Sequence, residues 1–107
     1  MSVYATNMFS THPGRARDLI DTLTRVLPDT LKHGGCELIQ ILHDQDDPNS
    51  VLAITRWTTR EHYEDYLSWR DGTGDTAMFR TMLTEPMKVA YYDTAFTTQV
   101  EPNEPRS

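Results

Sequence analysis

The chain has 107 residues, a formal net charge of −6 and one cysteine, Cys36, so it forms one domain with one core and no internal disulfide. The acidic balance, without a basic run, argues against nucleic acid and anionic membranes as partners. No apolar stretch approaches the roughly 20 residues of a membrane span, and the first 15 residues lack the pattern of a signal peptide; we therefore expect a cytoplasmic protein.

Three strands and one helix are predicted in the first 57 residues. β-Forming residues predict strands at 3–10, 36–43 and 51–57. Apolar residues at helical spacing predict an amphipathic helix over 14–27, which Pro28 kinks or ends. The polar turn at 44–50 lies between the second and third strands, which therefore form an antiparallel hairpin.

Two helices and a final strand are predicted in the second half. Thr58 and Glu61 have the spacing of a capping box, which begins a helix that runs to about Trp69. Gly72 and Gly74 break this helix, and a shorter helix follows. Its apolar face consists of Met78, Phe79, Met82 and Leu83. The last strand is predicted over 87–100.

This order of elements is the split βαβ pattern of an α+β ferredoxin-like domain with a four-stranded antiparallel sheet. The helices cover one face of such a sheet, and the chain has no spare element for the other face. The last strand is also long, at about 14 residues. Both features predict a homodimer, a dimeric α/β barrel. We expect the domain to span 1–100 and the polar, proline-containing tail 101–107 to be disordered.

Several runs of the sequence resemble the antibiotic biosynthesis monooxygenase family. The resemblance covers residues 3 to 96 and is carried by NMFSTHPGRARDLI, by GGCELIQILHDQDDPNSVLAITRWTTREHYEDYL and by EPMKVAYYDTAF. Its best markers are Pro13-Gly14, Gly35, the acidic turn before Pro48, and Trp57 at a strand end. The family consists of small dimeric α+β barrels, which agrees with the predicted order of elements.

The resemblance implies a monooxygenase that uses no flavin, haem or metal. A phenol or anthrone loses a proton, and the carbanion passes an electron to dioxygen. Recombination gives a peroxide, which loses water to form a quinone. The protein need only bind the aromatic or polyketide-like substrate, deprotonate it and exclude water. This agrees with a sequence that has no cofactor motif.

The resemblance also implies three catalytic positions. Quinone-forming members have a Trp at the end of this strand, a Tyr six residues later and an Asn four residues before the Trp. Here Trp57 and Tyr63 match, but Ala53 replaces the Asn. We hypothesise that Asn7, on the first strand, supplies the missing amide and stabilises the substrate oxyanion.

Five further residues are candidates for substrate binding: Tyr66, His62, Trp69, Phe79 and Met82. Tyr66 follows Tyr63 on one helical face, which could equally be a packing face. His62 is a plausible general base, although it could simply face solvent. Trp69 could form a pocket rim. Phe79 and Met82 suit the wall around a flat ligand or an ordinary core.

Other chemistries are disfavoured by the sequence. The haem-degrading branch of the superfamily also has an Asn at the place of Asn7, but its helical Trp and its iron-ligating His fall here near Tyr66 and Thr76. The acidic turn 43–47 lacks the glycine and the glutamate of a calcium loop, and no Cys/His set suits zinc. The glycines at 72–75 follow a helix, unlike a dinucleotide fingerprint.

Two alternatives to the oxygenase remain open. A polyketide cyclase or isomerase needs the same deprotonation and oxyanion stabilisation without dioxygen. A non-catalytic binder of a hydrophobic small molecule needs only the pocket. Oxygen uptake separates the first alternative from the oxygenase, and binding without turnover identifies the second.

Overall fold

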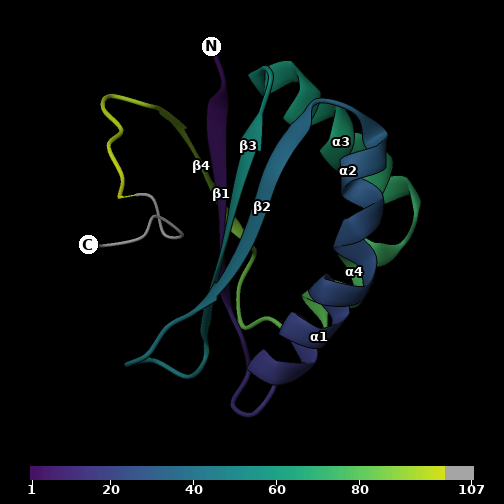
Figure 1. The fold of residues 1–107 in the computed structure, drawn as a ribbon. Coiled ribbons are helices and arrows are strands. Elements are labelled where there is room, and N and C mark those ends of the chain that lie inside the picture. The colour runs from purple at the N-terminus through teal and green to yellow at the C-terminus, as the bar shows by residue number, and fades with distance from the viewer. Residues whose placement is uncertain (101–107) are drawn as a thin grey trace.

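The computed structural model describes residues 1–100, so the predicted disordered tail lies outside the described residues. The strands and the main helices follow one another along the chain in the predicted order (Figure 1). The elements are β1 (Val3–Ser10), α1 (Ala16–Val26), a 3₁₀ turn (Leu27–Asp29), α2 (Thr30–His33), β2 (Cys36–His43), β3 (Ser50–Trp57), α3 (Arg60–Gly72), α4 (Asp75–Arg80) and β4 (Lys88–Asp93). Within the described residues, no helix is long and apolar enough to cross a membrane.

The four strands form one antiparallel sheet in the order β2-β3-β1-β4. The predicted α+β ferredoxin-like fold is therefore confirmed. Figure 1 shows the helices gathered on one face of this sheet. On β1, every second side chain is buried beneath the helices, namely Ala5, Asn7 and Phe9. This is the two-residue period of a strand.

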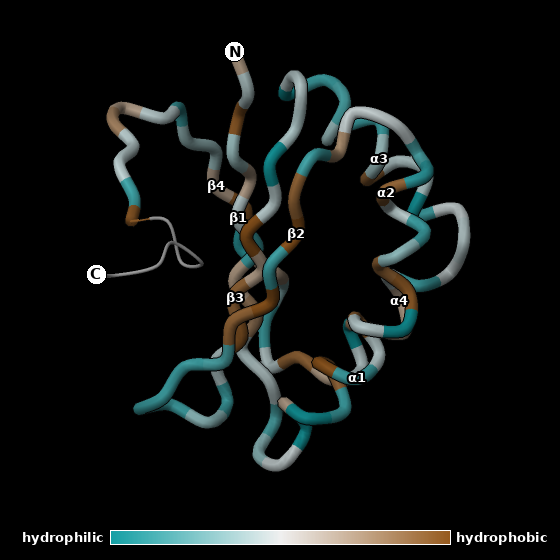
Figure 2. Tube along the Cα trace, viewed as in Figure 1, coloured by the Kyte–Doolittle hydropathy of each residue, from teal (hydrophilic) through white to brown (hydrophobic). Residues whose placement is uncertain are grey.

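The core between sheet and helices has two parts. One is aliphatic and centres on Phe9, Leu19 and Val51. The other is aromatic and centres on Trp57, Tyr63 and Tyr66. Figure 2 shows hydrophobic segments on the strands and on α1 and α4, whereas the loop between β2 and β3 is hydrophilic. The interface between the helix layer and the sheet is therefore aliphatic at one end and aromatic at the other.

The helix boundaries follow local signals with two corrections. The 3₁₀ turn at Leu27–Asp29 contains Pro28, as expected for a residue that cannot continue the α-helical hydrogen bonds. The residue that caps α3 is Thr59, not Thr58, because the Thr59 hydroxyl accepts from the backbone N–H of His62. The hydroxyl of Thr58 instead donates to Gly35 and Glu37, and α3 continues past Trp69 to Gly72.

The last strand and the last helix are shorter than predicted. β4 ends at Asp93 rather than at residue 100, because Asp93 pairs with Val3, the first residue of β1, and no neighbouring strand continues beyond it. α4 ends at Arg80, so Met82 and Leu83 lie after the helix. Both nevertheless join the aliphatic core, where a bridge between Leu83 and Thr11 holds the turn.

Gly35 provides a test of this packing. It has a φ of +86°, and a Cβ added there would lie 2.5 Å from ring atoms of His62. We expect Gly35→Ala to lower the free energy of unfolding by roughly 1–3 kcal/mol. Gly72→Ala is the control, because a Cβ there meets nothing within 4 Å and Ala favours a helix. Urea unfolding of both variants measures the difference, and equal stabilities would contradict the expected clash.

Candidate functional site

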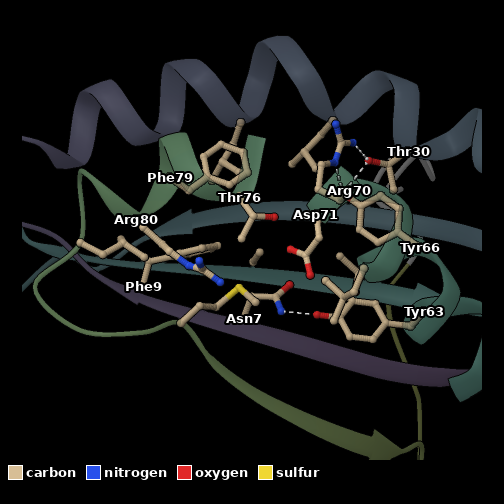
Figure 3. A pocket seen from close by; sticks show the side chains of 17 residues that line it. Asn7, Phe9, Thr30, Tyr63, Tyr66, Arg70, Asp71, Thr76, Phe79 and Arg80 are labelled. Atoms are coloured by element: carbon tan, nitrogen blue, oxygen red, sulfur yellow. Dashed lines mark hydrogen bonds between the residues drawn. The ribbon is translucent and has the colours of Figure 1, made fainter. Parts of the chain in front are cut away.

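A cavity of about 260 Å³ lies between the sheet and the helix layer. Most of its wall is apolar and comes from Phe9, Leu23, Leu27, Phe79, Leu83 and Met87. The polar groups enter from β1, β3, α2, α3 and α4, and Figure 3 shows those of Asn7, Asp71, Thr76 and Arg80 pointing into the space between the layers. A mostly apolar cavity with a few polar groups is typical of a small-molecule site.

Asn7 and Tyr63 form a buried hydrogen bond on the sheet side of this cavity. The amide Nδ2 of Asn7 donates to the hydroxyl of Tyr63 over 2.5 Å, and Figure 3 shows the two side chains meeting. Tyr63 is 1% exposed. Because its oxygen accepts from Asn7, its own proton is available for a ligand oxygen in the cavity.

Burial raises the pKa of Tyr63 to about 12, and the hydrogen bond from Asn7 opposes this rise. The phenol therefore keeps its proton at neutral pH. A neutral phenol can donate a hydrogen bond and stabilise a developing oxyanion. It cannot act as a resting phenolate base.

Arg70 lies at the opposite end of the cavity and holds several polar side chains there. It is only 4% exposed. Its guanidinium donates to the hydroxyl of Tyr66 over 3.1 Å and to the hydroxyl of Thr30 over 2.9 Å. It also pairs with the carboxylate of Asp75 over 2.7 Å. This pairing lowers the pKa of Asp75, and the three partners satisfy a buried cation that would otherwise be costly.

Trp57 supports both tyrosines from behind the cavity wall. Its ring centroid lies 5.4 Å from that of Tyr63 and 5.1 Å from that of Tyr66. Its indole N–H donates to the hydroxyl of Thr55 over 2.8 Å, and this hydroxyl donates to the carbonyl of Ala5. Trp57 is fully buried and is not part of the lining, so its place favours positioning of the tyrosines over contact with a ligand.

The structure brings four of the eight predicted site residues into the cavity lining: Asn7, Tyr63, Tyr66 and Phe79. Trp57, His62, Trp69 and Met82 are not part of this lining. The ring of His62 contacts the hydroxyl of Thr59 on the exposed side of α3. Trp69 is 40% exposed and packs against His33. Met82 lies in the aliphatic core.

Six polar lining residues were missed by the sequence analysis: Thr30, Thr55, Arg70, Asp71, Thr76 and Arg80. Arg70 and Asp71 follow Tyr66 and Leu67 by four residues each, so the helical face that contains Tyr63 continues onto them. Extending that face by one turn would have identified both. Thr30 and Arg80 have no comparable signal, because each meets the cavity only through tertiary packing.

Within residues 1–100, no group of three or more His, Cys, Asp or Glu side chains lies close enough together to hold a metal ion. The chemistry that these residues offer consists of hydrogen-bond donors, one carboxylate and two guanidinium groups around an apolar space.

The raised pKa of Tyr63 predicts how the free energy of unfolding changes at alkaline pH. An unfolded tyrosine ionises near pH 10, whereas folded Tyr63 does so near 12. The folded state therefore binds more protons between these values, and stability that is full below pH 10 is lost as the pH rises through 12. The loss is about 3 kcal/mol, at roughly 1.4 kcal/mol for each pKa unit.

Urea unfolding at pH 9 and pH 11.5 measures about 2 kcal/mol of this loss, because the rest follows as the pH rises past 12. Tyr63→Phe should lose less stability than the unmodified protein over this interval. Tyr92→Phe, at an exposed tyrosine, should lose as much as the unmodified protein. Identical losses in the two variants would show that Tyr63 ionises like an exposed tyrosine.

Comparison with known proteins agrees with the fold. A variant of SnoaB, a cofactor-independent oxygenase from Streptomyces nogalater, is 20% identical with a TM-score of 0.76, over 90% of this chain and 95% of that chain. A putative antibiotic biosynthesis monooxygenase from Deinococcus radiodurans is 17% identical with a TM-score of 0.76, over 92% and 98% of the two chains. Rv0793 from Mycobacterium tuberculosis is 16% identical with a TM-score of 0.77, over 92% and 100%. At these identities the likeness shows the fold alone.

The family comparison goes further than the fold. Among curated proteins, none matches the chain. The family model described as antibiotic biosynthesis monooxygenase, ABM, matches residues 2–71, which is more than half of the chain. The resemblance found in the sequence is thereby confirmed, and the chain belongs to the antibiotic biosynthesis monooxygenase family.

Proposed function

We propose that this protein is a cofactor-independent monooxygenase that oxidises a small aromatic or polyketide-like molecule with dioxygen. Its family and its likeness to a cofactor-independent oxygenase support this activity. The observation that carries the proposal is the buried Asn7–Tyr63 pair, which presents a neutral phenol to an apolar cavity. Such a group is suited to a substrate oxygen that gains negative charge during the reaction.

The proposed reaction begins with loss of a proton from the substrate. The resulting carbanion is delocalised onto a ring oxygen, which accepts the hydrogen bond of Tyr63. One electron passes from the carbanion to dioxygen, and the two radicals combine to a peroxide. Loss of water converts the original CH₂ group and O₂ into a carbonyl and H₂O. Tyr63 and Asn7 orient and stabilise the oxyanion, while the apolar wall excludes water.

The register of the sheet supports the hypothesis that Asn7 replaces the family amide missing at Ala53. Asn7 and Ala53 are direct cross-strand partners. Side chains of directly opposed residues lie on the same face of a sheet, about 5 Å apart. Both positions line the cavity. An amide from either strand can therefore reach the same region, and the small Ala53 leaves space for that of Asn7.

The cavity volume limits the substrate. An engineered apolar cavity of about 150 Å³ holds benzene, and pockets for drug-sized ligands span roughly 300–1,000 Å³. At about 260 Å³, the enclosed space suits a compact aromatic of about two fused rings. A larger substrate, such as the three-ring anthrone or a longer polyketide, would extend through the mouth of the cavity.

Oxygen uptake by purified, chelator-treated protein tests the proposal, with anthrone, 1-naphthol and substituted hydroquinones as substrates. We expect uptake with at least one of them. Asn7→Ala should lower kcat by about 10²- to 10³-fold, as expected for loss of one oxyanion donor. The double variant Asn7→Ala/Ala53→Asn should recover much of that loss, because it returns the amide from the opposite strand.

Each outcome has a distinct meaning. Unchanged turnover in Asn7→Ala would remove Asn7 from the oxyanion site. Binding of these compounds without oxygen uptake would contradict the oxygenase and favour the cyclase, isomerase or ligand-binding alternatives. Circular dichroism of each variant shows whether a loss of activity reflects loss of the fold.

We also propose that the protein is a homodimer. The helices cover one face of the sheet (Figure 1), and the opposite face presents the partly exposed side chains of Met8, Leu42 and Tyr92. Residues 94–100 follow β4 without a strand partner, and Phe96 among them is 82% exposed. An apolar sheet face beside an exposed apolar segment is typical of a subunit interface.

Light scattering at micromolar concentration tests the homodimer. We expect twice the mass of one chain, and Met8→Lys should shift the protein toward the monomer, because it places a charge on the apolar face. Ser68→Lys, at an exposed polar position of α3 in the helix layer, should leave the mass unchanged. A monomeric unmodified protein would contradict the proposal.

A further inference from the structure

We propose that Asp71 is the general base that removes the substrate proton. This inference rests on the proposed function, because it assigns the deprotonation that starts the reaction. Among the described residues that line the cavity, Asp71 is the only one with a carboxylate. A carboxylate is an effective general base where it can reach the acidic proton of a bound substrate.

The other titratable groups around the cavity do not suit this role. Arg70 and Arg80 are cations and have no lone pair to accept a proton. Tyr63 is a neutral phenol whose oxygen already accepts from Asn7. The oxygen of Tyr66 accepts from Arg70. His62, the base that the sequence suggested, contacts Thr59 away from the cavity.

The position of Asp71 also suits proton removal. Tyr63, Leu67 and Asp71 follow one another at four-residue spacing on α3, so all three line the same side of the cavity. Figure 3 shows the Asp71 carboxylate pointing into the cavity, toward the side occupied by Asn7 and Tyr63. A substrate whose oxygen accepts a hydrogen bond from Tyr63 would therefore present its adjacent C–H bond on the side of Asp71.

The carboxylate of Asp71 takes no part in the hydrogen bonds and ion pairs that hold the described fold. Within residues 1–100, its carboxylate has no hydrogen-bond or ion-pair partner, since Arg70 pairs with Asp75 instead. It lies in the last turn of α3, where the negative end of the helix dipole opposes an acidic side chain. A carboxylate placed there against the helix dipole, facing a cavity, is better explained by chemistry than by stability.

The step is a proton transfer that balances within the site. The substrate C–H bond breaks, an O–H bond forms on the Asp71 carboxylate, and the electron pair enters the conjugated system of the substrate. The developing oxyanion accepts a hydrogen bond from Tyr63. Because Asp71 is exposed to solvent as well as lining the cavity, the proton can then pass to water.

Anaerobic hydrogen exchange isolates this step from the oxygen chemistry. Anthrone is incubated with the protein in D₂O without dioxygen, and NMR follows deuterium entry at its acidic methylene carbon above the buffer rate. We expect Asp71→Asn to slow the enzymatic exchange by about 100-fold or more. Asp71→Glu should keep part of the rate. Asp65→Asn, the same change on the exposed side of α3, should stay within about twofold of the unmodified protein.

A thermal melt separates a chemical effect from loss of the fold. Asp71→Asn should melt at the same temperature as the unmodified protein or higher, because it removes an unfavourable charge from the helix end. Loss of exchange in a variant that remains folded supports Asp71 as the base. Equal exchange by Asp71→Asn and the unmodified protein, or no exchange above buffer by the unmodified protein, overturns the inference.

Oxygen uptake in the same samples keeps the two proposals apart. Exchange that depends on Asp71 without oxygen uptake would contradict the monooxygenase while supporting Asp71 as the base of a cyclase or isomerase. Oxygen uptake that is the same in Asp71→Asn as in the unmodified protein would support the monooxygenase and overturn the role of Asp71.

Discussion

The hydrogen bond between Asn7 and Tyr63 joins the sheet to the helix layer, and the site depends on it. Asn7 comes from β1, one of the two central strands, and Tyr63 from the first half of α3. Both side chains are buried, so each would be costly without the other. Their pairing determines which way the phenol points, leaves its proton free for a ligand, and holds the sheet side of an apolar cavity in place.

Hydrogen bonds and packing contacts also fix most of the other polar groups of the site. Arg70 is tied to Tyr66, Thr30 and Asp75, and this cluster joins α2, α3 and the start of α4. Trp57 packs against both tyrosines while its N–H is taken by Thr55. Groups that are already positioned need no reorganisation when charge develops on a bound molecule. Asp71 differs from them, because it is exposed and its carboxylate has no partner within the described residues; this agrees with the base role that we propose for it.

The predictions that failed share one physical cause. Turn residues and hydrophobic periodicity act over a few neighbours, so they located each element within a few residues. The length of β4 depends on something else, namely how far β1 extends beside it. The cap of α3 moved by one residue because the hydroxyl of Thr58 donates to Gly35 and Glu37, which lie more than twenty residues earlier. Contacts between distant segments overrode the local pattern in both places.

The sequence by itself determined the order of the elements, the one-sided sheet and the candidates Asn7, Tyr63, Tyr66 and Phe79, because local spacing specifies which side chains share a strand face or a helix face. Only the tertiary structure decided that Asn7 lies opposite Ala53 and bonds to Tyr63, and that the N–H of Trp57 is already occupied. It also decided that His62 and Trp69 lie outside the cavity whereas Arg70 and Asp71 line it. Periodicity indicates that a helix has a buried face. That Arg70, at its end, is drawn inward depends on its partners Thr30 and Asp75, which local spacing does not identify.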